Sequence, residues 1–430
     1  MKLFIGPKKN RVLPWIAKTF SGFLLKAMQN IHEVKITEAD KEMLRSLKNK
    51  RTIFFTNHPT TAEPPITFLI GNIIGQNFLY MASRQVFTWQ FGAIGWFIRR
   101  MGAYSIIAGT TDREALKMSR SILAAPEGKL AIYPEGEPTS GENDNLMPFQ
   151  AGVAQIGFWG LEDARKNEPD ADITVVQAFM KYTLRPEKEQ ILKDLDKSLS
   201  KIEKKLKLVP EHKHLLHRFL TVGRVLLERA EKEYNVTGNE GKDFDYRVGR
   251  VRHAMLDQIA DRLNAPNYDY HDDAIMKWRR IFAYIEMLQL NLPELNLPKV
   301  PREVVKWAHK ESIKVFDFIV IKRDYILEYP SGERLYEWLD RYESYLFNKT
   351  PRALGGVPSH LPRTAHVFFA KPFQLSEYFP ADKKERRKAV DQFTIDMRKQ
   401  MQELLNQSKG LSQPLFSADE VKEVAAKIKR

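Results

Sequence analysis

Hydrophobic residues in the first 180 positions, and again near residue 365, come in short runs separated by stretches of helical periodicity. Short apolar runs that end at Pro, Gly, Asn or His are typical of buried strands. Strands are expected at 51–56, 78–81, 129–133, 173–179 and 365–370, and helices at 86–100, 112–124, 150–160 and 382–406. This alternation predicts an α/β fold, in which a layered sheet lies between flanking helices.

After about residue 183 the pattern changes to long, highly charged stretches of helical periodicity. Between Glu187 and Lys207 the apolar residues fall on one stripe of a helix. Further helices, separated by Pro and Gly, are expected at 211–234, 243–263, 271–290, 302–328 and 332–347. We therefore expect an all-helical insertion at 183–362, within an α/β domain formed by 33–182 and 363–430.

Residues 1–32 hold six basic residues and no acidic one. Their apolar residues recur at helical spacing, at Ile16, Phe20, Phe23, Leu24 and Ala27. A basic amphipathic helix of this kind suits the surface of an anionic membrane, where each Lys contributes on the order of 1 kcal/mol. The same pattern is also typical of a helix that packs its apolar face on its own domain, and the sequence leaves both interpretations open.

Net charge and amino-acid composition favour some classes of protein function and exclude others. The chain has 68 Lys and Arg against 54 Asp and Glu, a net charge of +14, which indicates an anionic partner. With no cysteine, disulfides, a thiolate zinc site and a cysteine nucleophile are excluded. No signal peptide and no transmembrane run is expected. No nucleic-acid-binding signature is present either, so we expect a cytoplasmic protein that is peripheral on the membrane surface.

The segment Asn57-His58-Pro-Thr-Thr-Ala-Glu63 directly follows the first expected strand. A carboxylate five positions from a histidine, on a loop that enters a helix, can hold one ring nitrogen and raise the basicity of the other. This is the base half of a catalytic triad without its nucleophile. It suits deprotonation of a substrate hydroxyl, a task typically worth ~10²–10⁴-fold in rate. A structural turn with a hydrogen-bonded histidine is the alternative interpretation.

A second polar segment, from Tyr133 to Gly141, follows another expected strand. Gly136 permits close approach of the backbone to a ligand. Glu135 offers an acceptor for hydroxyls or for a basic side chain, while Thr139 and Ser140 offer donors to phosphate. An ordinary surface turn would contain the same residue types.

These two segments, in this order and about 75 residues apart, resemble the lysophospholipid and glycerol-phosphate acyltransferase superfamily. Five ordered blocks in matching strand context make the resemblance fairly specific, and it covers roughly 33–182 and 363–405. The remaining stretches similar to family blocks are Ser83-Arg84-Gln85 with Phe91–Trp96 and Met101–Ile107, then Ile173–Phe179, and finally Val367–Pro372.

The resemblance implies an acyltransferase that moves a fatty acyl group from an acyl thioester to a hydroxyl of a glycerolipid-like acceptor. His58 would be the general base and Glu63 would orient it, without a covalent acyl-enzyme. Acyl-CoA or acyl-carrier protein would be the donor substrate, with no metal and no other cofactor. The substrate-binding residues that the resemblance implies are Arg84, Glu135, Gly136, Thr139 and Ser140.

The sequence departs from the family pattern at several positions. Glu63 stands where the family has Asp, and Ala108 and Pro138 stand where it has arginines that bind phosphate. Gln177 stands near the usual proline of the fourth block. Fewer guanidinium groups mean fewer bidentate phosphate contacts. A second hypothesis is therefore a non-catalytic, membrane-associated protein that binds lipid or a partner on the same fold.

Two histidine groups in the insertion are weaker candidates. His212, His214 and His217 lie close together, but no carboxylate completes a convincing zinc set. His271-Asp272-Asp273 is similar to a phosphohydrolase His-Asp pair, and a helix N-terminus with acidic residues is the alternative. A phosphate-ester hydrolase is the third hypothesis, and the oligomeric state stays open.

Overall fold

The computed structural model describes residues 3–138, 144–150, 152–354, 356–357, 359–380 and 382–428. The chain divides into two compact units. The first unit comprises Met1–Thr139, Asp144–Thr183 and Pro358–Leu411, and the second comprises Leu184–Val357 and Ser412–Arg430.

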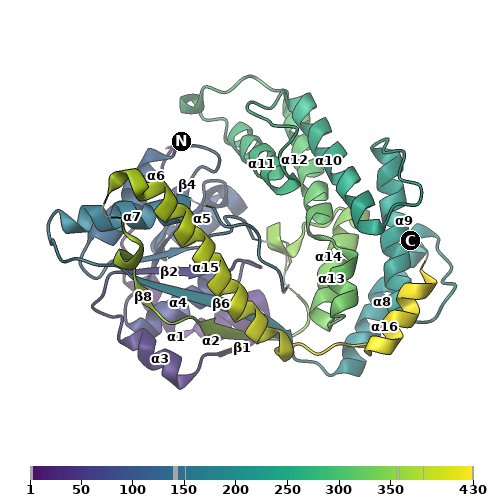
Figure 1. Cartoon of the computed structure of the whole chain (residues 1–430), viewed down its shortest axis with the longest axis horizontal. Helices are drawn as coiled ribbons and strands as arrows, with labels where there is room; N and C mark the ends of the chain where they lie inside the picture. The colour runs from purple at the N-terminus through teal and green to yellow at the C-terminus, as the bar shows by residue number, and fades with distance from the viewer. Residues whose placement is uncertain are drawn as a thin grey trace. The chain divides into compact units, whose positions relative to one another are not determined.

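The first unit is built on a mostly parallel sheet (Figure 1). Its strands are β1 (Ile31–Lys35), β2 (Thr52–Thr56), β3 (Leu79–Ser83), β4 (Ala103–Ile106), β5 (Lys129–Ile132), β6 (Thr174–Leu184), β7 (Arg363–Phe369) and β8 (Phe373–Gln374). They lie in the order β1-β7-β6-β2-β5-β3-β4, and β8 pairs with β6 in the antiparallel sense. The central strands β6, β2, β5, β3 and β4 pair in parallel, so their carboxyl ends share one edge.

Strand β7 joins the far side of β6 and pairs in parallel with β1. Thr183 of β6 hydrogen-bonds His366, whereas Gln177 accepts a bond from Ala370, four residues further along. Residue numbers therefore rise along one strand as they fall along the other, which makes β7 antiparallel to β6. Strand β7 thus enters the sheet from the opposite direction.

Both faces of the sheet are covered by helices, as the residues of β2 illustrate. All five residues of β2 are buried. Ile53 and Phe55 belong to the hydrophobic cluster of one face, and Phe54 to that of the other. Successive side chains of a strand point to opposite faces, so a central strand covered on both sides is apolar throughout. The α/β class predicted from the alternation is confirmed.

Each face has its own set of helices. The face of Phe54 is covered by α2 (Ser21–Gln29), α3 (Glu38–Arg45) and α4 (Glu63–Ile74). The face of Phe55 is covered by α6 (Arg113–Ala124), α7 (Gly152–Arg165) and α15 (Arg386–Ser408).

The second unit is helical. Between β6 and β7, the residues that the structure describes form helices and connecting turns but no strand. The helices are α8 (Lys188–Leu206), α9 (Leu215–Glu233), α10 (Phe244–Leu263), α11 (Ala274–Leu290), α12 (Arg302–Val320), α13 (Arg323–Glu328) and α14 (Gly332–Phe347), with α16 (Ala418–Lys427) from the end of the chain.

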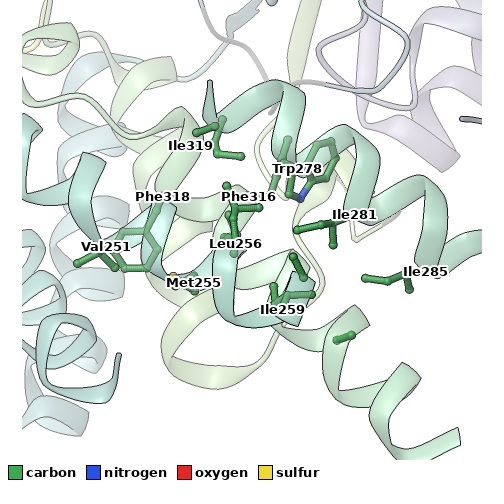
Figure 2. Packing of buried hydrophobic residues seen from close by; sticks show 14 of the residues in the cluster. Val251, Met255, Leu256, Ile259, Trp278, Ile281, Ile285, Phe316, Phe318 and Ile319 are labelled. Carbon is green, nitrogen blue, oxygen red and sulfur yellow. The ribbon is translucent and has the colours of Figure 1, made fainter. Parts of the chain in front are cut away.

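The core of the second unit forms where α10, α11 and α12 bring their apolar stripes together (Figure 2). Trp278 is fully buried, and its ring centroid lies 4.9 Å from that of Phe316. The indole N–H donates to the carbonyl of Ser312 at 2.9 Å, so the one polar atom of the side chain is satisfied.

The sequence assigned residues 363–430 to the α/β domain, but the end of the chain belongs to the second unit. The chain joins the second unit after Leu411. Leu415 N–H donates to the carbonyl of Pro330, and Val421 and Val424 of α16 are buried. These are long-range contacts, which local periodicity does not indicate.

Several expected helices are interrupted. The expected N-terminal helix is two helices, α1 (Val12–Thr19) and α2, with non-helical backbone at Phe20. The expected helix 302–328 is broken where Ile321 and Lys322 become extended. Among the described helices, none is both long enough and apolar enough to cross a bilayer.

Strands β1, β4 and β8 were not among the strands expected from the apolar runs, although β4 lies within Met101–Ile107, a stretch similar to a family block. Only Ile31 of β1 is fully buried, and the strand carries three charged or ionisable residues at an edge of the sheet. Polar edge strands of this kind discourage pairing with other chains, and they lack the apolar run by which a buried strand is predicted.

We expect Trp278→Ala to lower the free energy of unfolding by about 3–5 kcal/mol, because it leaves a cavity in the core and removes the donor to Ser312. Urea denaturation followed by circular dichroism measures this change. Trp96→Ala is the matched control, because Trp96 is 54% exposed, and it should change stability by about 0.5 kcal/mol or less. Equal effects of the two variants would contradict the packing described for Trp278.

Candidate functional site

The register of β2 against β5 brings the two polar segments together at the carboxyl edge of the sheet. Phe55 pairs with Ile132, so His58 and Glu135, each three residues further along, lie at the same level. The backbone N–H of His58 donates to Oε1 of Glu135 at 2.9 Å. The sheet therefore joins two segments that are 77 residues apart in the sequence.

The imidazole of His58 is held by the carboxylate of Glu63. Nδ1 of His58 lies 2.8 Å from Oε2 of Glu63. Glu63 is the first residue of α4, and Pro64 and Pro65 follow in the first turn, where helical N–H groups have no partner within the helix. The helix start places the carboxylate beside the loop, close to the positive end of the helix dipole.

The Glu63 side chain is fully buried and accepts four hydrogen bonds. Oε2 accepts from Nδ1 of His58 and, at 2.9 Å, from the backbone N–H of Thr60. Oε1 accepts from the Thr60 hydroxyl at 2.9 Å and from the hydroxyl of Tyr182. Burial, reinforced by the charge of Glu63, raises the pKa of Tyr182 well above its usual range, so this hydroxyl keeps its proton and donates.

This arrangement assigns the tautomer of His58. Because the carboxylate acts as the acceptor towards every neighbour, the neutral ring carries its proton on Nδ1 and its lone pair on Nε2. The ring stacks on Tyr133, with centroids 4.5 Å apart and an interplanar angle of 28°. Within the described part of the chain, no hydrogen bond is made to Nε2. His58 can therefore accept a proton at Nε2 while its orientation stays fixed.

Glu135 is fully buried and binds backbone amides with both oxygens. Oε1 accepts from His58 N–H, and Oε2 accepts from the N–H of Met147 at 2.7 Å. Burial raises the pKa of Glu135 to about 7, and the two amides offset part of this rise. The carboxyl group thus ties the turn after β5 to the His58 loop and to the segment that precedes α7.

Gly136 forms the exposed end of the turn after β5. Its φ of 84° is left-handed, a conformation that glycine adopts without strain, and its N–H donates to the carbonyl of Tyr133 at 3.0 Å. Thr139 and Ser140, which the sequence suggested as phosphate donors, lie outside the described residues.

Arg84 follows β3 at the same edge of the sheet, but its side chain is buried. Its Nε donates to the carbonyl of Leu3 at 3.1 Å, and burial lowers the pKa of the guanidinium. Arg84 thus holds the N-terminal segment against the first unit.

Three positions that depart from the family pattern have clear locations. Ala108 lies in a turn after β4, and Pro138 lies at the end of the described part of its loop. Gln177 is buried in β6, and neither its amide nitrogen nor its amide oxygen has a hydrogen-bond partner within the described residues. Neither Ala108 nor Pro138 supplies a guanidinium group for phosphate.

Tyr182 is the participant that the sequence did not reveal. It lies 119 residues from Glu63 in the sequence and comes close because β6 continues beyond the end of β2. Arg363 lies over its ring, 5.3 Å from the centroid. A tyrosine near the end of an apolar strand gives no local signal of such a contact.

The histidines of the insertion show no comparable arrangement. No group of three possible metal ligands forms among the residues that the structure describes. Asp272 forms an ion pair with Arg280 at 2.6 Å, while Asp273 caps α11 by accepting from the N–H groups of Ile275 and Met276. The geometry at 271–273 matches the helix N-terminus that was the alternative interpretation.

Comparison with protein-family models gives no match to this chain, and comparison with curated protein sequences gives none either. The function is therefore inferred from the geometry of the site and from the motif resemblance alone.

The raised pKa of Glu135 predicts a pH-dependent stability. Between its ordinary value of 4.5 and about 7, the unfolded state loses a proton that the folded state keeps, so this group lowers stability as the pH rises. The full effect is on the order of 3 kcal/mol.

Glu135→Gln removes this titration. We expect the difference in Tm between wild type and variant to change across this pH window and to level off above it. Thermal melts at a series of pH values measure the difference. Curves that stay parallel throughout would show that Glu135 does not titrate with a raised pKa.

Proposed function

We propose that the chain is an O-acyltransferase, in which His58 is the general base and Glu63 orients it. The observation that carries the proposal is the buried Glu63 carboxylate, which fixes the Nδ1–H tautomer of His58 by accepting four hydrogen bonds. The sheet with helices on both faces, and the order of the polar segments along it, also support the acyltransferase-type layering that the resemblance implies.

In the proposed reaction, Nε2 of His58 takes the proton from the acceptor hydroxyl as its oxygen attacks the thioester carbonyl. The tetrahedral intermediate collapses, the C–S bond breaks, and the thiolate receives the proton from the imidazolium. The products are an ester and a free thiol. Atoms and charge balance without a covalent acyl-enzyme, consistent with a histidine–carboxylate pair that has no adjacent nucleophile.

The substrates we propose are an acyl thioester, on coenzyme A or acyl-carrier protein, and a glycerolipid-like alcohol. The N-terminal helices support a peripheral location on an anionic membrane. Trp15 on α1, Phe20 between the two helices and Phe23 on α2 are exposed, together with Lys18 and Lys26. Exposed aromatic residues interspersed with lysines are typical of helices that lie in the membrane interface.

The second of these helices also contacts the loop of His58. Gln29, the last residue of α2, donates through Nε2 to the hydroxyl of Thr61 at 3.3 Å. Thr61 lies within the His58–Glu63 loop. A lipid acceptor bound near α2 would therefore approach the general base along a short path.

A non-catalytic lipid-binding or partner-binding protein on the same fold is the second candidate. The observations that favour it are Ala108 and Pro138, where the family has arginines that bind phosphate, and the buried amide of Gln177. Turnover of any acyl donor by the purified protein would eliminate this candidate.

We expect His58→Ala to lower the rate of acyl transfer by about 10²–10⁴-fold, because the hydroxyl loses its proton acceptor. The measurement is formation of acylated lipid by purified protein, with palmitoyl-CoA and a lysophospholipid in vesicles. His271→Ala is the matched control, because His271 is an exposed histidine of the second unit, and it should keep the full rate. Full activity of the His58 variant would contradict the mechanism.

Tyr182→Phe removes one donor to Glu63 and leaves the buried carboxylate under-satisfied. We expect a loss of about 10-fold in kcat with little change in KM, because His58 is held less firmly while substrate contacts persist. Steady-state kinetics across a pH series provides the measurement. Tyr80→Phe is the control, since Tyr80 is also a strand tyrosine but makes no contact with Glu63. Identical kinetics for the two variants would remove Tyr182 from the mechanism.

A further inference from the structure

A second group of exposed aromatic residues lies in the first unit, between β3 and β4. Trp89 and Phe91 occupy the 3-10 segment η1 (Val86–Gly92), and Trp96 lies on α5 (Ala93–Arg100). Trp89 is 39% exposed, Trp96 is 54% exposed, and Phe91 is as exposed as in an extended peptide, at 109%. Large aromatic side chains clustered in water usually mark a surface that binds something apolar.

The backbone holds this turn in an unusual conformation. Gln90 and Phe91 both have left-handed backbone, with φ of 48° and 55°, and neither is glycine. Left-handed backbone is unfavourable for a residue with a side chain by roughly 1–2 kcal/mol. The expected helix 86–100 is therefore interrupted at the point where Phe91 projects into solvent. Such strain persists where the surrounding structure fixes it and often marks a functional segment.

Packing around Gly95 fixes the turn. A Cβ on Gly95 would lie 2.3 Å from the carbonyl oxygen of Phe87, so only glycine allows α5 to pack this closely on η1. Phe87 itself is buried. The backbone of the turn is thus anchored from beneath by this packing.

The charged residues of this stretch of the sequence are all basic. Residues 84–111 contain Arg84, Arg99 and Arg100 and no acidic residue. The Arg100 guanidinium lies 4.0 Å from the ring centroid of Trp96, so cation and aromatic ring share one face of α5. This combination matches an anionic lipid surface, where tryptophan occupies the headgroup level and arginine attracts phosphate.

The turn is also connected to the N-terminal helices by ordered backbone. Lys8 N–H donates to the carbonyl of Arg99 at 2.9 Å, and Nε of Arg99 donates to the carbonyl of Gly6 at 3.0 Å. Helix α1 begins at Val12, only four residues after Lys8. Four extended residues span at most about 14 Å, so the exposed face of α1 starts close to the end of α5.

We propose that the Trp89–Phe91 turn and Trp96 form a second contact with an anionic lipid bilayer, in which Phe91 inserts into the interface beside the N-terminal helices. This contact goes beyond the proposed acyl transfer, because it concerns binding to the bilayer and requires no turnover. A turn held rigidly at a second point would also fix the orientation of the first unit on the surface.

The test is co-sedimentation of the full chain with vesicles of phosphatidylcholine and phosphatidylglycerol. Phe91→Ser should lower the partition coefficient about tenfold or more, because the side chain no longer leaves water. Ile395→Ser is the matched control, since Ile395 is 61% exposed on α15, and it should bind as the wild type does. Thermal melts of both variants verify that each is folded.

A second measurement reports directly whether residue 91 enters the bilayer. The chain has no cysteine, so Phe91→Cys carries a single environment-sensitive fluorophore, and Ile395→Cys carries the same fluorophore as control. On addition of anionic vesicles, the label at 91 should shift to the blue and be quenched by brominated lipid, while the label at 395 should not.

Unchanged partitioning of Phe91→Ser, or a label at 91 that stays in water when the protein is bound to vesicles, would overturn the proposal. The second result would indicate that this surface binds a protein partner instead of a bilayer. Because neither readout involves acyl transfer, an inactive enzyme that still inserts its turn would refute only the proposed function.

Discussion

The organisation of the candidate site depends on one buried carboxylate. Glu63 lies out of contact with solvent, where an ionised carboxylate is stable only if hydrogen-bond donors replace the lost water. The loop supplies donors through His58 and Thr60, and the end of β6 supplies one through Tyr182. Satisfying this one group therefore fixes the conformation of the loop and the orientation of the imidazole together.

The sheet supplies the second constraint. Parallel pairing of β2 with β5 sets His58 level with Glu135, and their hydrogen bond joins the two polar segments. Each oxygen of the Glu135 carboxyl group accepts from a backbone amide in this arrangement, and the contact with substrate that the sequence suggested stays a prediction. The position of Glu135 makes it a support for the His58 loop, and Gly136 forms the exposed edge of the turn.

Aromatic residues exposed on the surface of the first unit suit the proposed reaction with a lipid. The N-terminal helices and the turn at Phe91 both expose aromatic residues with basic neighbours and without acidic ones. The proposed acyl transfer to a lipid requires access to a bilayer, whereas the proposed base, His58, requires a site with limited access of water. A domain with a polar site at one sheet edge and aromatic residues on exposed helices can meet both requirements.

The sequence by itself determined the local features. Alternating apolar runs and helical stretches predicted the α/β fold and the helical stretch after residue 183, because period and length reflect whether backbone hydrogen bonds are local or between strands. The meeting of His58 and Glu63 was also predictable, since both lie on one short loop that enters a helix. Only the tertiary structure decided that Tyr182 and Met147 complete the two carboxylate sites, that α16 joins the second unit, and that Phe91 interrupts an expected helix. Those features arise from strand register and close packing between distant segments, for which the local pattern of residues carries no signal.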